Sequence, residues 1–233
     1  MKSFQALMTC FLCLALPGWQ LGNSQRPAGL LPTQFATQVL QGDRLLVVAT
    51  AETVTLLGMG TAVVRLRVGE RLAGEGPGAK EELLLLAHAR EFHVGNKALL
   101  VLEPFGKGGR YRVRFRVDTR EVNYLQKLEM CRLQVAIIEG APPNRLVPAT
   151  LELLTNSLVA PDKWTRNYAL SELAWISNVH PEFLTASRLA ELRSVALISP
   201  WPEVTDGVES VLAIMARRTE ALRARAQQES SSL

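Results

Sequence analysis

Between residues 43 and 117 the apolar positions form short alternating or continuous runs that are separated by glycine-rich breaks. Alternation with a period of two is typical of β-strands, and glycine supplies the positive φ that a tight reversal needs. The pattern predicts five strands, at residues 45–55, 61–68, 82–89, 98–103 and 110–117. The connections are too short for ordinary helices, so we expect an antiparallel barrel or sandwich rather than a parallel sheet. Closure into a barrel is favoured because it removes exposed edges.

After Asp118 the apolar spacing changes to three and four, which indicates helices. Asp118 and Glu121 have the spacing of a capping box, so a helix is predicted to begin there. Its apolar positions are Val122, Leu125, Leu128 and Leu133. Further helices are predicted at residues 148–158, 163–176, 185–197 and 206–225, with Asp162 as the N-cap of the second of these.

These patterns together predict an α+β protein, with a small antiparallel β-barrel followed by an α-helical domain. The expected divisions are a signal peptide at residues 1–25, the barrel domain at 26–118, the helical domain at 119–226 and a disordered, serine-rich tail at 227–233.

The first residues have the layout of a secretory leader, with Lys2, an apolar run at residues 4–16, and then Pro17 and Gly18. The apolar run is shorter than the roughly 20 residues that a helix needs to cross a bilayer. We therefore expect a cleaved signal peptide, no stable membrane span, and a secreted or periplasmic protein. Lipidation at Cys10 is the less favoured alternative, because Thr9 fits poorly before a lipidated cysteine.

Removal of this leader would leave Cys131 as the one remaining cysteine of the three in the chain. The mature protein would then have no internal disulfide, and its fold would depend on buried apolar surface, for which 48% hydrophobic content is ample. The formal charge of +4 is too small to establish a polyanionic partner.

Two segments resemble known structural families. The sequence VRLRVGERLAG at residues 64–74, followed by FHVG at 92–95 and ALLVL at 98–102, resembles small exported bacterial β-barrel domains. Those domains are similar to the OB-fold barrel of netrin-like and metalloproteinase-inhibitor-like modules, although the cysteines that staple the animal modules are absent here. Residues 161–173, with Arg166, Ala169 and Leu173 at matching offsets, resemble the second helix of a HEAT-type repeat. That resemblance implies a small packed layer of helix pairs.

Catalytic chemistry has one candidate set. His88, Glu91 and His93 lie within six residues and form a plausible zinc or iron set, but strand alternation would point the two histidines to opposite faces unless a turn intervenes. Cys131 lies in an apolar helical pattern and is expected to be a buried structural thiol. No Gly-x-Ser-x-Gly elbow is present in the sequence, and residues 106–109 fit a hairpin turn better than a phosphate loop. We expect no cofactor.

The most distinctive pattern is the strand RYRVRFRV at residues 110–117. Alternation predicts that its arginines line one face of the strand, with Tyr111, Val113, Phe115 and Val117 on the other. The predicted ligand-binding residues are Arg110, Arg112, Arg114 and Arg116, joined by Arg65 and Arg67 if their strand is a neighbour. One alternative is a solvated face whose charge is balanced by Glu52, Glu70, Glu82 and Glu103. Another is that the arginines protect an edge strand against aggregation.

These features favour an exported, non-enzymatic binding or scaffold protein of the cell envelope. Its expected partner is an envelope protein or an anionic envelope polymer, and not nucleic acid, because exposed aromatic stacking residues are not evident. The alternative is an envelope hydrolase, possibly metal-dependent, whose site would lie between the barrel and the helices and use His88, His93 and a nearby glutamate. The oligomeric state is left open by the sequence.

Overall fold

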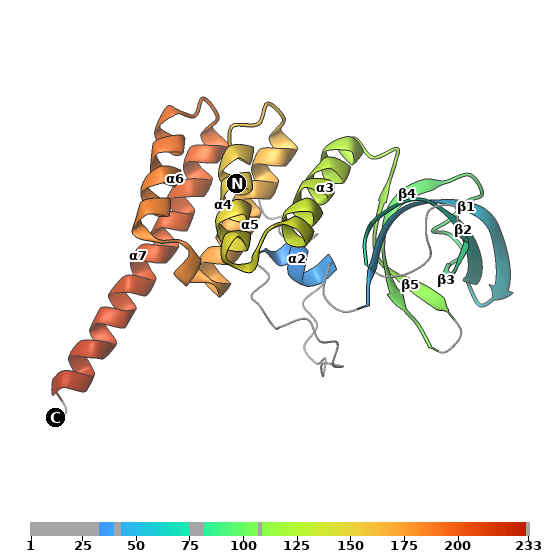
Figure 1. The fold of residues 1–233 in the computed structure, drawn as a ribbon, viewed down its shortest axis with the longest axis horizontal. Helices are drawn as coiled ribbons and strands as arrows, with labels where there is room; N and C mark the ends of the chain where they lie inside the picture. Colours follow the sequence, from blue (N-terminus) through green and yellow to red (C-terminus); the bar gives the residue numbers. More distant parts are fainter. Residues whose placement is uncertain (1–32, 40–42, 75–81, 107–108, 232–233) are drawn as a thin grey trace.

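The computed structural model describes residues 33–39, 43–74, 82–106 and 109–231. A β-barrel and a set of helices lie side by side along the long axis of the molecule (Figure 1). The signal peptide predicted at residues 1–25 lies outside the described residues. None of the described helices is both long and apolar enough to cross a membrane.

Five strands form a closed barrel in the order β1-β2-β3-β5-β4, which confirms the predicted OB-like architecture. The strands are β1 (Leu45–Gly58), β2 (Thr61–Ala73), β3 (Glu82–His88), β4 (Lys97–Pro104) and β5 (Arg110–Asp118). Their positions match the predicted strands closely. The β1–β2 hairpin is longer than predicted, and Met59 at its tip has a positive φ of 48° between two glycines.

One ladder of the barrel departs from the antiparallel prediction. Residues 84–86 of β3 pair in parallel with residues 110–112 of β5, whereas the other four ladders are antiparallel. The antiparallel prediction was based only on the connections between strands that are consecutive in the sequence. Here β4 lies between the two partners in sequence, so the chain can return in the same direction without a crossover helix.

The barrel interior is a continuous apolar core. Alternate residues of the strands enter it, including Val47, Val64, Leu85 and Leu100, each of which is fully buried. Phe92, from the β3–β4 connection, joins the same core and is 2% exposed. The connection between β3 and β4 forms no helix, and it contributes one aromatic ring to the barrel core.

The helical part follows β5. Its elements are α3 (Tyr124–Gly140), α4 (Pro143–Ser157), α5 (Lys163–Val179), the short 3₁₀ helix η1 (Pro181–Phe183), α6 (Ala186–Ile198) and α7 (Pro202–Ser231). The Asp162 side chain accepts a hydrogen bond from the Thr165 N–H at 2.8 Å, which confirms the predicted N-cap of α5. The helix α7 runs to Ser231 and so includes residues 227–231, where the composition predicted a disordered tail.

The first helix differs from its prediction in start and in buried face. Glu121 does accept the N–H of Asp118 at 3.0 Å, but α3 begins only at Tyr124. Val122 and Leu125 are 95% and 72% exposed. The buried face contains Leu128, as predicted, together with Tyr124, Cys131, Gln134 and Val135. This face is set by contact with the barrel, which the leucine spacing alone does not encode.

An apolar core joins the barrel to the helices. The outward-facing residues Leu46, Leu99 and Val101 of β1 and β4 pack against Leu128 and Cys131 of α3 in one cluster. Cys131 is buried, as predicted, and burial raises the pKa of its thiol to about 12. It is therefore a structural thiol and not a nucleophile at neutral pH.

A short helix that the sequence patterns did not predict, α2 (Gln34–Val39), lies between the barrel and the helices (Figure 1). Its N–H groups at Gln34 and Phe35 donate to the Glu172 carboxylate of α5 at 2.7 and 3.0 Å. The Tyr168 hydroxyl donates to the same carboxylate at 3.0 Å. Burial raises the pKa of Glu172 to about 7, against the opposing effect of these donors. Glu172 thus fastens the segment before β1 to α5.

Candidate functional site

The arginine-rich strand β5 is interrupted by a bulge. Val101 of β4 lies opposite Phe115, but the next residue, Leu102, lies opposite Val113. Arg114 is therefore an extra residue in β5. An inserted residue of this kind reverses the inside–outside alternation beyond it.

The bulge places the β5 arginines on different sides of the barrel wall. Arg112 lies opposite Glu103 on the outer side, whereas Arg116 lies opposite Leu100, a core residue. The Arg116 guanidinium accordingly stacks over the Phe92 ring of the barrel core, 4.5 Å from its centroid. The prediction that the four β5 arginines share one face is therefore wrong, because strict alternation does not survive a bulge.

An outer group of charged residues forms around Glu103. The Arg112 and Arg114 Nε atoms both donate to Glu103 Oε2, at 2.7 and 2.6 Å. Arg44 lies just before β1. The charges of Glu103, Arg112 and Arg114 are close enough to influence the pKa of Arg44. We call Arg44, Arg112, Arg114 and Glu103 the arginine cluster. It places two guanidiniums on one carboxylate, with the charge of a third nearby.

The pKa shifts within the arginine cluster reflect burial and neighbouring charge. Burial opposes ionisation of Glu103, but hydrogen bonds from Arg114 and Arg112 outweigh it and lower the pKa of that carboxyl. Burial lowers the pKa of Arg44, Glu103 opposes the shift, and the like charges of Arg114 and Arg112 add to it. The charges of the arginine cluster therefore influence one another.

The backbone at Arg44 is held by the end of β2. Gly74 has a φ of +91°, and a Cβ at this position would collide with the carbonyl oxygen of Arg44. A glycine is therefore required for β2 to end against the start of β1 at this point. This close contact holds the backbone of Arg44 at the start of β1, and the Arg44 side chain extends from there to the arginine cluster.

The other predicted arginines lie outside the arginine cluster. Arg110 is exposed at the start of β5. Arg116 is ion-paired with Asp118 at 2.8 Å. Arg65 and Arg67 belong to β2, which β3 separates from β5, so the two strands are not neighbours. Arg65 is paired with Glu82 at 3.4 Å, and Arg67 is paired with Glu52.

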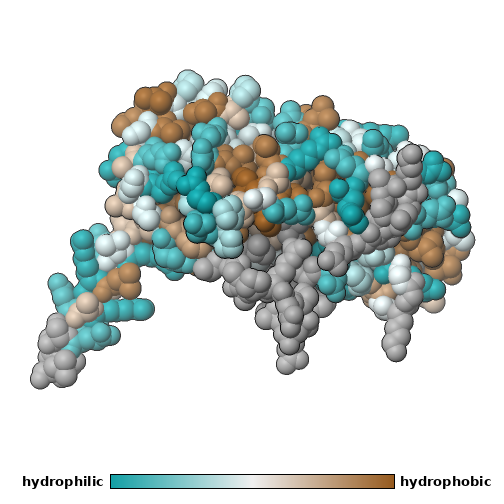
Figure 2. All heavy atoms as spheres, viewed as in Figure 1, coloured by the Kyte–Doolittle hydropathy of each residue, from teal (hydrophilic) through white to brown (hydrophobic). Residues whose placement is uncertain are grey.

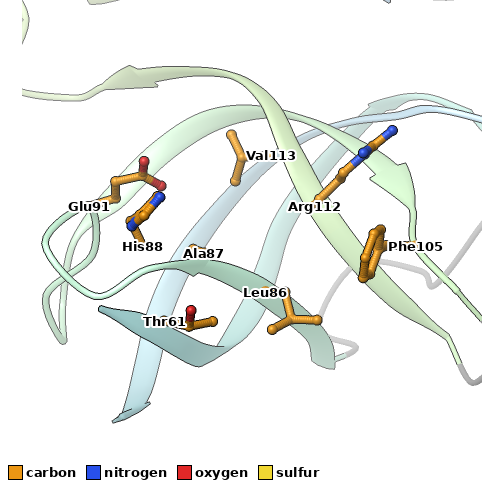
Figure 3. Close-up of a pocket in the computed structure, with 8 residues that line it drawn as sticks. All are labelled: Thr61, Leu86, Ala87, His88, Glu91, Phe105, Arg112 and Val113. Carbon is orange, nitrogen blue, oxygen red and sulfur yellow. The ribbon is translucent and has the colours of Figure 1, made fainter. Parts of the chain in front are cut away.

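A pocket adjoins the arginine cluster where β3 and β5 diverge beyond their short parallel ladder. It has a volume of about 350 Å³, and its lining is Thr61, Leu86, Ala87, His88, Glu91, Phe105, Arg112 and Val113. Figure 3 shows His88 and Glu91 close together at one end and Phe105 beside Arg112 at the other. The Arg112 guanidinium lies 5.7 Å from the centroid of the Phe105 ring. Arg112 thus belongs to both the pocket and the arginine cluster.

The alternative metal set is only partly assembled. His88 and Glu91 line this pocket, whereas His93 does not. Among the described residues no group of three histidine, cysteine, aspartate or glutamate side chains is arranged to hold a metal ion. The hydrolase alternative placed its site between the barrel and the helices, where the described side chains include an apolar cluster and the ion pair of Arg132 with Glu70.

Sequence reasoning missed Arg44 and Phe105 as members of the candidate site, and it considered Glu103 only as a balancing charge. Arg44 is isolated in the sequence and is brought to β5 by the pairing of β1 with β4, which aligns Leu45 with Leu102. Phe105 follows β4 directly, and its side chain is 45% exposed, which is unusual for an aromatic residue and fits a place in a binding site. A basic residue at a strand start gives no signal until the neighbouring strand is known.

No protein-family model matches this chain, and no curated protein is significantly similar to it in sequence. The chemistry of the arginine cluster and its pocket is therefore what indicates a function.

Proposed function

We propose that this chain is an exported, non-enzymatic binding protein of the cell envelope, and that its barrel binds an anionic ligand at the arginine cluster. The observation that carries the proposal is that Arg112 and Arg114 both donate to the single carboxylate of Glu103, with the charge of Arg44 close by. The planar guanidinium fork suits carboxylate, sulfate and phosphate oxygens, which it can bind through two parallel hydrogen bonds.

Partial exposure suits the arginine cluster to binding. The side chains of Arg112 and Arg114 are 36% and 30% exposed, so a ligand can reach them, yet they are shielded enough to strengthen an electrostatic contact. Phe105 and the adjoining pocket offer an apolar wall for the uncharged part of the same ligand. These features support an acidic envelope polymer or an acidic partner protein as the ligand class.

The direct test measures retention of the full exported chain on an immobilised anionic polymer, dextran sulfate, in a salt gradient. The variant R112Q/R114Q removes two positive charges from the arginine cluster. The matched control R188Q/R217Q removes the same charge from α6 and α7. We expect R112Q/R114Q to elute at clearly lower salt, with affinity reduced about tenfold or more, and the control to elute like the parent protein.

A second variant, E103Q, separates binding from stability. Loss of the carboxylate leaves the guanidiniums with less compensation, so we expect tighter retention together with a fall of about 1–3 kcal/mol in the free energy of unfolding. If E103Q and R112Q/R114Q both lower stability while retention stays unchanged, the arginine cluster is a structural ion-pair network and the proposal fails.

A further inference from the structure

One edge of β1 lies open in the far half of its hairpin. β4 pairs with β1 from Leu45 to Thr50 only, whereas β2 stays paired with β1 as far as Gly58. Within the described ranges, no strand pairs with the other edge of residues 53–58. Backbone N–H and C=O groups along such an edge are a template for an added strand.

This edge lacks two of the usual protections against pairing, although register shifts in the β1–β2 ladder lie on either side of residues 53–56, at Ala51/Thr53 and at Leu56/Gly58. Residues 53–59 contain no charged residue and no proline, the two features that most often block an exposed strand. Leu56, Leu57 and Met59 are 69%, 60% and 105% exposed. The hairpin lies at the end of the molecule opposite α7 (Figure 1), and apolar atoms gather at that barrel end in Figure 2.

We propose that this edge of β1 pairs antiparallel with the same edge of a second copy of the chain. A two-fold axis beside Thr55 would set Val54 opposite Leu56 of the other copy, and Leu56 opposite its Val54. Val54 already packs against the barrel core, so these cross-strand pairs extend an existing apolar face. Such an interface is self-complementary, as two-fold symmetry requires.

The same register also covers the hairpin tip. Strand pairing stops short of Ala51, because its N–H and carbonyl are already bonded to Asn96 and Gly95 of the same copy, at 2.9 and 2.8 Å. Met59 of the other copy would still approach this connection. The neighbouring Val94 is 67% exposed. Met59 and Val94, both left to solvent in one copy, would then meet across the interface and add apolar contact to the strand pairing.

Charge favours a second copy over an unrelated acidic or basic strand. The nearest charged side chains on the hairpin are Glu52, Arg65 and Arg67, and each is ion-paired, Glu52 with Arg67 and Arg65 with Glu82. Two uncharged edges can therefore approach without like-charge repulsion. This edge lies at the end of β1 that is far from Arg44. Pairing of two copies through it is therefore independent of the arginine cluster.

The test measures the mass of the full exported chain by sedimentation across a wide concentration range. We expect a reversible dimer, and we expect L56K to raise its dissociation constant by about tenfold or more, because the added charge would lie against Val54 of the other copy. The matched control is L222K, since Leu222 is 65% exposed and belongs to α7, which lies at the other end of the molecule from the barrel (Figure 1). It should leave the dimer unchanged.

Disulfide trapping reports the register. Residues directly opposite in an antiparallel pair have Cβ atoms about 4.5–5.5 Å apart, close to the span of a disulfide. We expect T55C to form a covalent dimer on mild oxidation, and T219C, at an exposed threonine of α7, to form little. A chain that stays monomeric at every concentration, T55C that couples no faster than T219C, or a dimer that L56K and L222K weaken equally would each overturn the proposal.

Discussion

The barrel and the helical part each contain an arginine bound to a glutamate, and the two arrangements differ in how the guanidinium is used. In the helices, Arg166 is 4% exposed and donates to the carbonyls of Ala160 and Pro161 and to Glu203, at 2.7, 2.9 and 2.7 Å. Its guanidinium also stacks over Trp201, 4.2 Å from the ring centroid. One cation thus serves several fixed acceptors, and the arrangement ties α5 to the start of α7.

On the barrel, two guanidiniums meet on one carboxylate. Arg112 and Arg114 both donate to Glu103, and their side chains remain about one-third exposed. An arginine–glutamate pair is therefore not by itself a sign of binding. Burial separates the two arrangements, because a ligand can reach a partly exposed guanidinium but not Arg166.

The largest expected effect comes from breaking the helical arrangement. R166A leaves two backbone carbonyls and Glu203 without their donor, so the free energy of unfolding should fall by about 3–5 kcal/mol in chemical denaturation. The control R188A breaks the exposed pair with Glu191 and should cost less than about 1 kcal/mol. An equal loss in both variants would show that Arg166 is no more structural than a surface arginine.

A second effect of similar size concerns the buried Glu172. Its pKa rises from an ordinary 4.5 to about 7 on folding, so the folded state holds its proton more tightly than the unfolded state. The stability that this gives is fully present below about pH 4.5 and is lost as pH rises through 7. The free energy of unfolding should therefore fall by up to about 3 kcal/mol across this window.

E172Q isolates this pH dependence, because the amide does not titrate. Denaturation at a series of pH values should show a flatter profile for E172Q than for the parent, while E152Q, at an exposed glutamate of α4, keeps the parent slope. Parallel profiles for E172Q and the parent would contradict the raised pKa.

The smallest effect is expected on β2. Arg67 is paired with Glu52, but its side chain is 64% exposed. R67Q should therefore change the free energy of unfolding by less than about 1 kcal/mol. It should also leave retention on dextran sulfate close to that of the parent, unlike R112Q/R114Q. A loss of retention as large as that of the arginine-cluster variant would extend the binding surface to β2.

Local sequence patterns were a reliable guide where the cause was local. The positions of all five strands followed from alternation and glycine breaks, and the N-cap at Asp162 followed from its place before an apolar helical pattern. Burial of Cys131 followed from its helical neighbours. The buried face of α3 did not, because α3 packs against the outer barrel wall and Leu125 has no partner there among the described residues.

The candidate site depended on contacts distant in sequence. The arginines of β5 were visible as a pattern, but the bulge at Arg114 is a property of the β4–β5 pairing, and it moved Arg116 to the opposite side of the wall. Arg44 reached the arginine cluster only because β1 pairs with β4. Glu172 caps α2 through the N–H groups of Gln34 and Phe35, which precede it by 138 and 137 positions in the sequence.

Local patterns in the sequence were enough to locate the five strands and most of the helices, although not α2, because the period of apolar residues and the capping groups act within a few residues of each other. Only the tertiary structure decided which charged groups meet. Strand order, a one-residue bulge and the packing of α2 bring residues together through long-range pairing, and the free energy of that pairing is not encoded in any one local pattern.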